Sequence, residues 1–254
     1  MHIIRQGIIL YEGPSQIDQQ PVVAIATGLI NPSPNRKTGP MVQVYMMRSD
    51  QHPLQALHTG NDVSVCGNCQ HRGEVVVGDD GKRRMTERSC YVTMIHGPSS
   101  VYRTYQSGGY ERVSPLMARK ILTGRLVRIG SYGDPAAVPL PVWDTVLAKV
   151  NDLTAYTHLW RNFPDLKTFC MASCDTPEER EEAKAVGFRT YRVRPPGADV
   201  LDGEGQCPAS SEMGHAVQCI QCMLCGGLRT KAKADLTIEA HGTGHAHYVR
   251  RSAE

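Results

Sequence analysis

Apolar residues gather in short runs near the amino end of the chain, and these runs predict strands. Two stretches rich in Ile and Val, at residues 3–11 and 22–30, are separated by a polar turn. Three prolines and a glycine at residues 31–40 indicate a loop, and residues 41–47 follow as a third predicted strand. Between residues 98 and 124 apolar positions recur every three to four residues, which indicates helix.

From residue 126 onward, predicted strands alternate with predicted helices. The strands are expected at residues 126–130, 154–158, 167–173, 188–193 and 235–240, and the helices at 141–150, 160–166 and 176–187. Because such alternation is typical of βαβ units, it predicts an α/β fold with a parallel sheet. We expect this sheet to close as a partial or irregular parallel (β/α) barrel.

The pattern also predicts a division of the chain into two parts. Residues 1–199 are expected to form the α/β core domain, in which two extended segments at 75–77 and 91–95 flank a solvated turn. Residues 200–254 are expected to form an irregular, cysteine-rich C-terminal lobe packed on this core. The histidine- and glycine-rich stretch at 241–247 predicts that the lobe ends in a mobile polar tail.

The charge balance does not indicate a nucleic-acid binder. The 254 residues include 28 Lys and Arg against 25 Asp and Glu, a net charge of +3, which is too small to predict a basic binding surface. No apolar run approaches the ~18 residues of a membrane-spanning helix, and the first residues lack a signal-peptide pattern. We therefore expect a protein of the reducing cytoplasm that has no membrane contact.

Nine cysteines are the main chemical signal, and their odd number excludes a fully paired disulfide framework. The run Cys219, Cys222 and Cys225 is typical of [4Fe–4S] cluster ligation, and Cys207 is the nearest candidate for a fourth ligand. The two glycines after Cys225 are expected to let the backbone approach the cluster. Zinc is the alternative occupant, because four cysteines are a common structural zinc set.

A second group of cysteines offers three thiols and no evident fourth. Cys66 and Cys69 form a CxxC pair, and Cys90 follows twenty residues later. Three protein ligands leave a metal centre with an open position, which is typical of a reactive site. His71 or His96 could supply a fourth ligand, as in a Cys₃His zinc site, although for His71 alone the pattern favours a surface histidine in a polar loop.

A CxxC pair followed by a lone cysteine resembles the cluster motif of the carbon–phosphorus lyase, a radical SAM (S-adenosylmethionine) enzyme. The common CxxxCxxC pattern of that superfamily is absent. Gly133, Asp134 and Pro135 resemble the Gly-Gly-Glu-Pro segment that ends the second strand in radical SAM enzymes, with Asp for Glu and one Gly for two. This resemblance implies that Tyr132, Gly133 and Asp134 lie against S-adenosylmethionine. The alternative interpretation of these residues is an ordinary strand-to-helix loop that binds no cofactor.

The whole chain also resembles an uncharacterised family associated with bacteriophage genomes. The shared segments are residues 66–72, 89–92, 128–135, 173–176, 207–210 and the run from Cys219. This family implies no known reaction; for a phage-encoded protein the compartment would be the host cytoplasm.

These patterns predict an iron–sulfur protein with one or two [4Fe–4S] clusters. We expect a radical-SAM-like enzyme that uses S-adenosylmethionine as its small-molecule cofactor at an open iron. The alternative is a non-catalytic zinc or iron–sulfur module that acts on nucleic acid or a protein partner, for instance in phage biology.

Other candidate residues follow from the predicted strand ends. Cys170 is expected in the core, and Cys174 lies where a side chain could bind a metal or react. We expect a pocket at the carboxyl ends of successive strands, lined by Tyr132, His158, Trp160 and Asp175.

Overall fold

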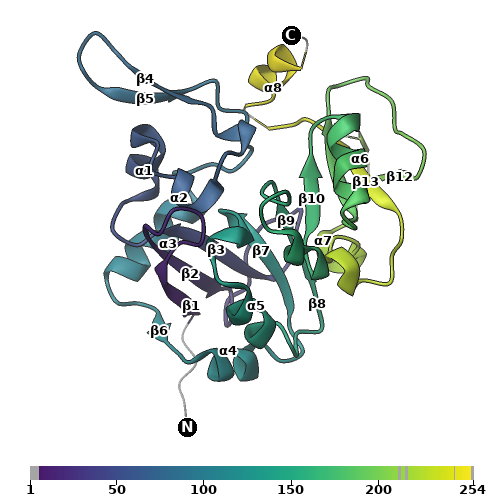
Figure 1. Cartoon of the computed structure of the whole chain (residues 1–254). Coiled ribbons are helices and arrows are strands. Elements are labelled where there is room, and N and C mark those ends of the chain that lie inside the picture. The colour runs from purple at the N-terminus through teal and green to yellow at the C-terminus, as the bar shows by residue number, and fades with distance from the viewer. Residues whose placement is uncertain (1–5, 211–212, 215–216, 243, 253–254) are drawn as a thin grey trace.

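The computed structural model describes residues 6–210, 213–214, 217–242 and 244–252, and most of its strands belong to two sheets (Figure 1). The first sheet has the order β6 (Glu111–Arg112), β1 (Gly7–Pro14), β2 (Pro21–Thr27), β3 (Val42–Arg48), β7 (Leu126–Tyr132) and β8 (Asp152–Thr154). The pairs β1–β2 and β2–β3 are antiparallel, whereas β3, β7 and β8 run parallel.

The second sheet is parallel throughout. Its order is β12 (Glu204–Gln206), β13 (Asp235–Glu239), β11 (Thr190–Arg194), β10 (Met171–Cys174) and β9 (Tyr156–Thr157). Only Ala155 separates β8 from β9, so one extended segment passes from the first sheet into the second. The parallel strands β3, β7, β8, β9, β10, β11 and β13 therefore follow one another in space as they do along the chain.

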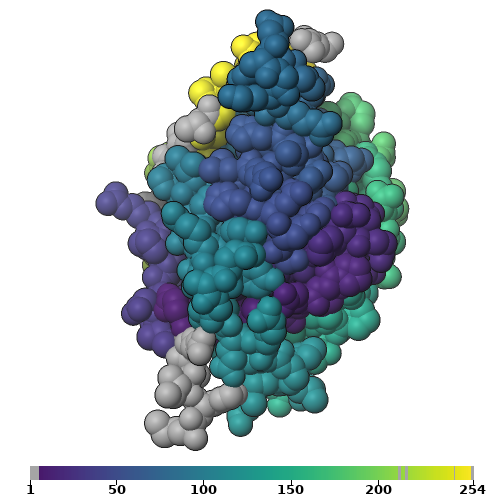
Figure 2. Space-filling view, turned by 90° about the vertical axis from the view of Figure 1, so that its left-hand side faces the viewer, coloured from purple at the N-terminus to yellow at the C-terminus, as the bar shows by residue number. Residues whose placement is uncertain are grey.

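Helices and one long hairpin complete the fold. The helices are α1 (Pro53–Thr59), α2 (Val63–Cys66), α3 (Gly97–Gln106), α4 (Pro115–Leu122), α5 (Leu140–Val146), α6 (Pro177–Ala185), α7 (Cys219–Cys222) and α8 (His245–Arg251). Single 3₁₀ turns lie at Gln70–Arg72, Pro135–Ala137, Pro164–Thr168 and Gly227–Arg229. The antiparallel hairpin of β4 (Glu74–Val77) and β5 (Arg83–Thr86) projects from the body, and in Figure 2 it stands above the rest of the molecule.

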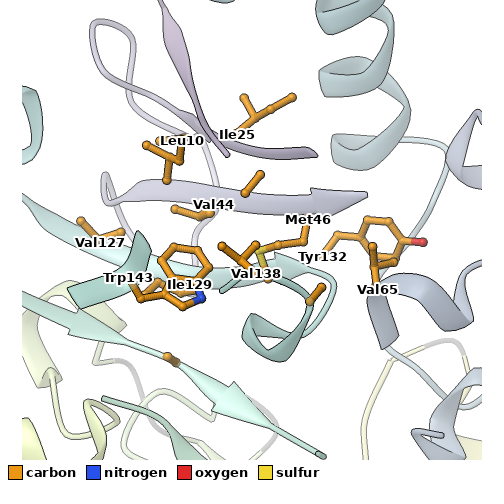
Figure 3. Close-up of a cluster of buried hydrophobic side chains, with 14 of the residues drawn as sticks. Leu10, Ile25, Val44, Met46, Val65, Val127, Ile129, Tyr132, Val138 and Trp143 are labelled. Atoms are coloured by element: carbon orange, nitrogen blue, oxygen red, sulfur yellow. The ribbon is translucent and has the colours of Figure 1, made fainter. Parts of the chain in front are cut away.

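The main apolar core lies between the first sheet and the helices that follow its strands. Val44 and Ile129 are completely buried on the side of the sheet that faces Trp143 of α5, and Ile25 is completely buried on the opposite side (Figure 3). The indole nitrogen of Trp143 donates to the carbonyl of Pro135 at 2.9 Å. Apolar burial of this kind stabilises a fold by about 25 cal/mol per Å². Tyr132 lies at the edge of the cluster, and its hydroxyl points away from the other labelled side chains (Figure 3).

The structure confirms a mixed α/β fold with parallel strands and differs from the sequence-based prediction in its details. The first strand begins at Gly7, and residues 3–5 of its predicted range lie outside the described residues. The helix predicted at 160–166 is a turn followed by the 3₁₀ segment Pro164–Thr168, because the proline begins a new turn there. The segment predicted at 91–95 forms no strand; β4 pairs with β5 instead.

The end of the chain is more ordered than its composition predicts. Two strands of the predicted C-terminal lobe, β12 and β13, complete the second sheet, with β13 inserted beside β11. The expectation of a mobile polar tail is wrong: α8 packs on the body through Tyr248, whose hydroxyl donates to the carbonyl of Val193 at 2.7 Å. Among the described residues, no helix is long and apolar enough to cross a membrane.

Candidate functional site

A cavity of about 220 Å³ opens where the carboxyl ends of the parallel strands meet the C-terminal segments. Carboxyl ends of parallel strands are the usual place for ligand sites in α/β folds. The cavity wall contains every cysteine that the sequence singled out as a metal ligand: Cys66, Cys69, Cys90, Cys207, Cys219, Cys222 and Cys225. The two groups predicted separately therefore face one space. We call Cys66, Cys69 and Cys90 the three-cysteine set, and the other four the four-cysteine set.

Local backbone contacts assemble the three-cysteine set. Cys66 ends α2, and the backbone N–H of Cys69 donates to its carbonyl at 3.3 Å. The N–H of Cys90 donates to the carbonyl of His71 at 3.0 Å, which returns the chain to the same loop. The β4–β5 hairpin fills the interval between His71 and Cys90, so it explains the twenty-residue gap in the motif.

Arg72 braces this loop from within. Its guanidinium binds the carboxylate of Asp62 at 2.5 Å and the carbonyls of Gly60 and Gly67 at 2.9 and 3.1 Å. Both side chains of the Arg72–Asp62 pair are largely buried, and removing one partner of such a pair is costly. The loop is therefore held in shape by protein groups alone.

The thiols of this set are neutral at pH 7 when no metal is bound. Burial raises the pKa of Cys66 well above its usual value, and the nearby Asp62 carboxylate raises it further. Burial likewise raises the pKa of Cys69 to about 12 and raises that of Cys90. Because thiolates are the metal-binding form, a metal must displace these protons.

Distant segments hold the four-cysteine set in place. The N–H of Cys207 donates to the carbonyl of Thr237 in β13 at 2.8 Å, and the N–H of Cys219 donates to that of Lys37 at 2.9 Å. The carbonyl of Cys225 accepts from the N–H of Ala155 at 3.0 Å, at the point where β8 gives way to β9. Burial raises the pKa of Cys219, Cys222 and Cys225, so these thiols too are neutral without a metal.

The two glycines after Cys225 lie against neighbouring backbone. A Cβ on Gly227, which has φ +57°, would lie 2.7 Å from backbone atoms of Cys170 and Lys167. A Cβ on Gly226 would lie 3.0 Å from the carbonyl oxygen of Leu153. Both glycines therefore let the cysteine-bearing loop pack directly on neighbouring backbone.

Arg128 lies between the two cysteine sets. Its guanidinium donates to the hydroxyl of Tyr91, the neighbour of Cys90, at 2.6 Å, and lies 5.8 Å from the ring centroid of Tyr156. Burial alone would lower the pKa of Arg128, but Tyr91, Tyr156 and Cys219 raise it above its usual value. A positive charge is therefore fixed inside the cavity.

Two tyrosines contact the four-cysteine set directly. Tyr156 and Tyr191 pack against Cys225, and Tyr191 also packs against Cys207. Their rings meet edge to face with centroids 4.7 Å apart. Burial raises the pKa of both tyrosines well above the usual value, so both hydroxyls are protonated at neutral pH.

The segment predicted to hold S-adenosylmethionine also lines the cavity, at the end of β7. Gly133 has φ +81°, and a Cβ there would lie 2.6 Å from the carbonyl oxygen of Met46. The Asp134 carboxylate accepts from the N–H groups of Ala136 and His158 at 2.9 and 2.8 Å, and from the hydroxyl of Thr157 at 2.8 Å. Asp134 thus caps the following 3₁₀ turn, as an ordinary strand-to-helix loop would require.

These contacts leave room for a further bond to Asp134. An ionised carboxylate offers about four lone-pair sites, of which the three donors use three. Burial raises the pKa of Asp134, although its hydrogen bonds oppose the rise. Tyr132 is buried beside it, and burial raises the pKa of its hydroxyl well above the usual value.

The expectation that His71 lies on the surface is wrong. Its Nδ1 lies 2.8 Å from the hydroxyl of Ser89, its Nε2 lies 2.9 Å from Oδ1 of Asp175, and its ring stacks on Tyr248. Both ring nitrogens are thus engaged by protein groups. His96 is exposed and does not line the cavity, so neither histidine is positioned as a fourth ligand of the three-cysteine set.

The other residues at the strand ends have different surroundings. Cys170 is buried in the core, as predicted. Cys174 is also fully buried, donates to the carbonyl of Ala172 and does not line the cavity. Trp160 is buried with its indole nitrogen on the carbonyl of Ser173, whereas His158 lines the cavity.

The comparisons with known proteins give no match: no family model, no curated protein and no solved structure is similar to this chain. The function must therefore be argued from the cavity itself.

Sequence reasoning missed several residues that form the cavity. Arg128, Tyr156 and Tyr191 lie in strands. Arg128 begins the shared segment 128–135, but no motif gave any of the three a role. The one available signal for Arg128 was a lone charge in an otherwise apolar run, which indicates a buried or functional arginine when the strand is covered on both faces.

Proposed function

We propose that this protein binds iron–sulfur clusters at its two cysteine sets and performs radical-SAM-like chemistry in the cavity between them. The observation that carries the proposal is the shared cavity: seven cysteines from two distant parts of the chain line it together with Tyr132, Gly133 and Asp134. Cysteines that served only as small apolar side chains would have no reason to gather on one wall.

Iron–sulfur clusters and zinc require different spacings of the thiols. Four thiolates on one zinc ion, with bonds of about 2.3 Å, lie about 3.8 Å apart. A cubane separates its cysteine sulfurs more widely, by about 6 Å, because each binds a different iron. Metal analysis of the purified protein therefore has to decide between the two occupants.

The topology supports the same proposal. The strands from β3 to β13 follow one another in parallel, and the β8–β9 segment joins the two sheets. We propose that they form the wall of a partial, open (β/α) barrel. The three-cysteine set then follows the first parallel strand, and the Gly133–Asp134 turn follows the second.

Within this proposal the chain's own residues have distinct tasks. The three-cysteine set would hold a cluster with one open iron, which supplies one electron to bound S-adenosylmethionine. Asp134 would accept a hydrogen bond from the amino group of the cofactor through its remaining lone pair. Arg128 offers a fixed positive charge to a carboxylate, and the tyrosines exclude water from the cavity. The four-cysteine set would hold a fully ligated cluster that relays electrons or stabilises the fold.

Anaerobic reconstitution with iron and sulfide tests the proposal. We expect about four iron atoms for each filled set, a broad absorption band near ~400 nm that bleaches with dithionite, and 5′-deoxyadenosine on reduction with S-adenosylmethionine. Cys90→Ala should lose one cluster and all 5′-deoxyadenosine. The buried Cys174→Ala is the matched control, because Cys174 does not line the cavity.

The outcomes separate the alternatives. Iron without 5′-deoxyadenosine would leave an electron carrier or a structural cluster. Colourless protein that carries only zinc would favour a binding module for nucleic acid or a protein partner, and would contradict the enzyme proposal. The oxygen sensitivity of such clusters fits a reducing compartment, so we propose that the protein works in the cytoplasm, which would be that of the host for a phage-encoded chain.

A further inference from the structure

We propose that His71, His158 and Asp175 bind a divalent first-row transition-metal ion, at a site separate from both cysteine sets. One ligand atom of each residue lies within 4.8 Å of the other two. Among the described residues this is the only group of three or more histidine, cysteine or carboxylate side chains that meets this distance. The inference does not depend on the clusters, because none of its ligands is a cysteine.

The spacing suits one ion between the three side chains. Nε2 of His71 lies 2.9 Å from Oδ1 of Asp175, about half an ångström less than the separation of about 3.4 Å between neighbouring ligands of a tetrahedral ion with bonds of about 2.1 Å. His158 has to approach by a small side-chain rotation. Two histidines and one carboxylate form the ligand set of many zinc sites and of non-haem iron(II) sites.

The surroundings orient the first two ligands as a metal site requires. His71 Nδ1 lies 2.8 Å from the hydroxyl of Ser89, so that when Nδ1 carries the proton, the lone pair of Nε2 faces Asp175 and an ion would replace the contact between them. The side-chain amide of Gln70 donates to the second oxygen of Asp175. The N–H of Asp175 donates to Glu179 at 2.8 Å, which fixes the backbone.

His158 supplies the observation that points to a ligand. Its Nε2 is buried, and none of the described residues hydrogen-bonds to it. A buried nitrogen without a hydrogen-bond partner is unfavourable, and a bound ion would remove that cost. The backbone of His158 is held by Asp134, and its ring lies 5.3 Å from that of His71 at an angle of 70°.

The position of the site indicates what the ion would do. His71 and His158 line the same cavity as the cysteines. Three protein ligands leave coordination positions open, and these would face the cavity. The ion would then bind an oxygen or nitrogen atom of a substrate, or a water molecule, beside the three-cysteine set.

Zinc K-edge X-ray absorption tests this site on protein whose cysteines are loaded with clusters or, where no cluster forms, are alkylated, because blocked cysteines cannot capture the zinc. We expect one tightly bound zinc per chain with nitrogen and oxygen neighbours at about 2.0–2.1 Å and no sulfur at about 2.3 Å. His158→Ala should weaken zinc binding at least about tenfold, while the iron content stays unchanged. The exposed His96→Ala should bind zinc like the wild type.

Two results would overturn the inference: sulfur neighbours around the zinc, or wild-type zinc binding in His158→Ala. Absence of tight zinc and iron(II) binding in the wild type would do the same. Asp175→Asn keeps the side-chain shape and provides a second variant, with circular dichroism as the check on folding. Iron content and 5′-deoxyadenosine, measured on the same samples, report the cluster proposal independently.

Discussion

The three-cysteine set is built from residues close together in the sequence, whereas the four-cysteine set depends on distant parts of the fold. Cys66 and Cys69 share one loop, which the buried Arg72–Asp62 pair braces. Cys207, Cys219 and Cys225 hydrogen-bond through their backbones to β13, to the loop at Lys37 and to Ala155. The two sets share a cavity but differ in what positions them.

The difference predicts how the loss of a ligand affects the folding of each region. A loop held by its own ion pair keeps its shape when a ligand is lost, so chemistry can be removed there without unfolding. A segment that packs against several strands transmits a change to the sheet. We therefore expect substitutions at the four-cysteine set to affect folding, and those at the three-cysteine set to affect activity.

The largest expected effect compares two glycines that have the same φ. Gly227 and Gly67 both have φ +57°, but a Cβ on Gly227 meets backbone, whereas one on Gly67 meets the buried side chain of Leu159. Gly227→Ala should lower the free energy of unfolding by about 4 kcal/mol or more, and Gly67→Ala by about 2 kcal/mol. Urea unfolding of the metal-free protein measures both. Equal losses of unfolding free energy in the two variants would contradict the expected difference between the loops of the four-cysteine and three-cysteine sets.

The next comparison concerns the cysteines themselves. Each of Cys225→Ala and Cys90→Ala should remove about half of the bound iron, because each empties one set. In the metal-free protein Cys225→Ala should cost about 1–2 kcal/mol, since Cys225 packs against Met171 and Leu236. Cys90 is less buried, and its substitution should cost at most about 0.5 kcal/mol. Iron analysis and urea unfolding measure both effects. A larger loss of stability in Cys90→Ala than in Cys225→Ala would contradict the prediction.

Arg128 offers a test of what couples the two sets. Arg128→Met removes the buried charge beside Tyr91 and Tyr156 but keeps a side chain of similar length. A nearby positive charge favours the reduced form of a cluster, so the variant should shift cluster midpoint potentials to more negative values without losing iron. Redox titration monitored by electron paramagnetic resonance measures the shift. Arg125→Met, at the amino end of the same strand, should leave the potentials unchanged.

The smallest expected effect concerns the docked C-terminal helix. Tyr248→Phe removes the hydroxyl that donates to the carbonyls of Val193 and Asp175 at 2.7 and 3.3 Å. It should lower the free energy of unfolding by about 1 kcal/mol, with iron content unchanged. Thermal unfolding with iron analysis is the measurement. If the variant is as stable as the wild type, the hydrogen bonds of Tyr248 contribute little to the docking of α8 beside His71.

Much of the fold could be predicted from local patterns, and the errors have physical causes. The alternation of strands and helices after residue 126 predicted the parallel strands, because periodicity reports which face of an element is buried. The insertion of β13 beside β11 could not be predicted, since strand order depends on pairing between residues more than forty positions apart. Helix α8 could not be predicted either, because its residues are mostly polar and only Tyr248 is buried.

The sequence by itself determined which cysteines group together along the chain. Short spacings between residues can be recognised from the sequence alone. Examples are the CxxC pair, the run from Cys219 and the glycine that follows β7. Only the tertiary structure decided that both cysteine sets face one cavity, with Arg128 between them. It alone paired His71 with Asp175, 104 residues away. Such proximity comes from the packing of two sheets, and no periodicity along the chain encodes it.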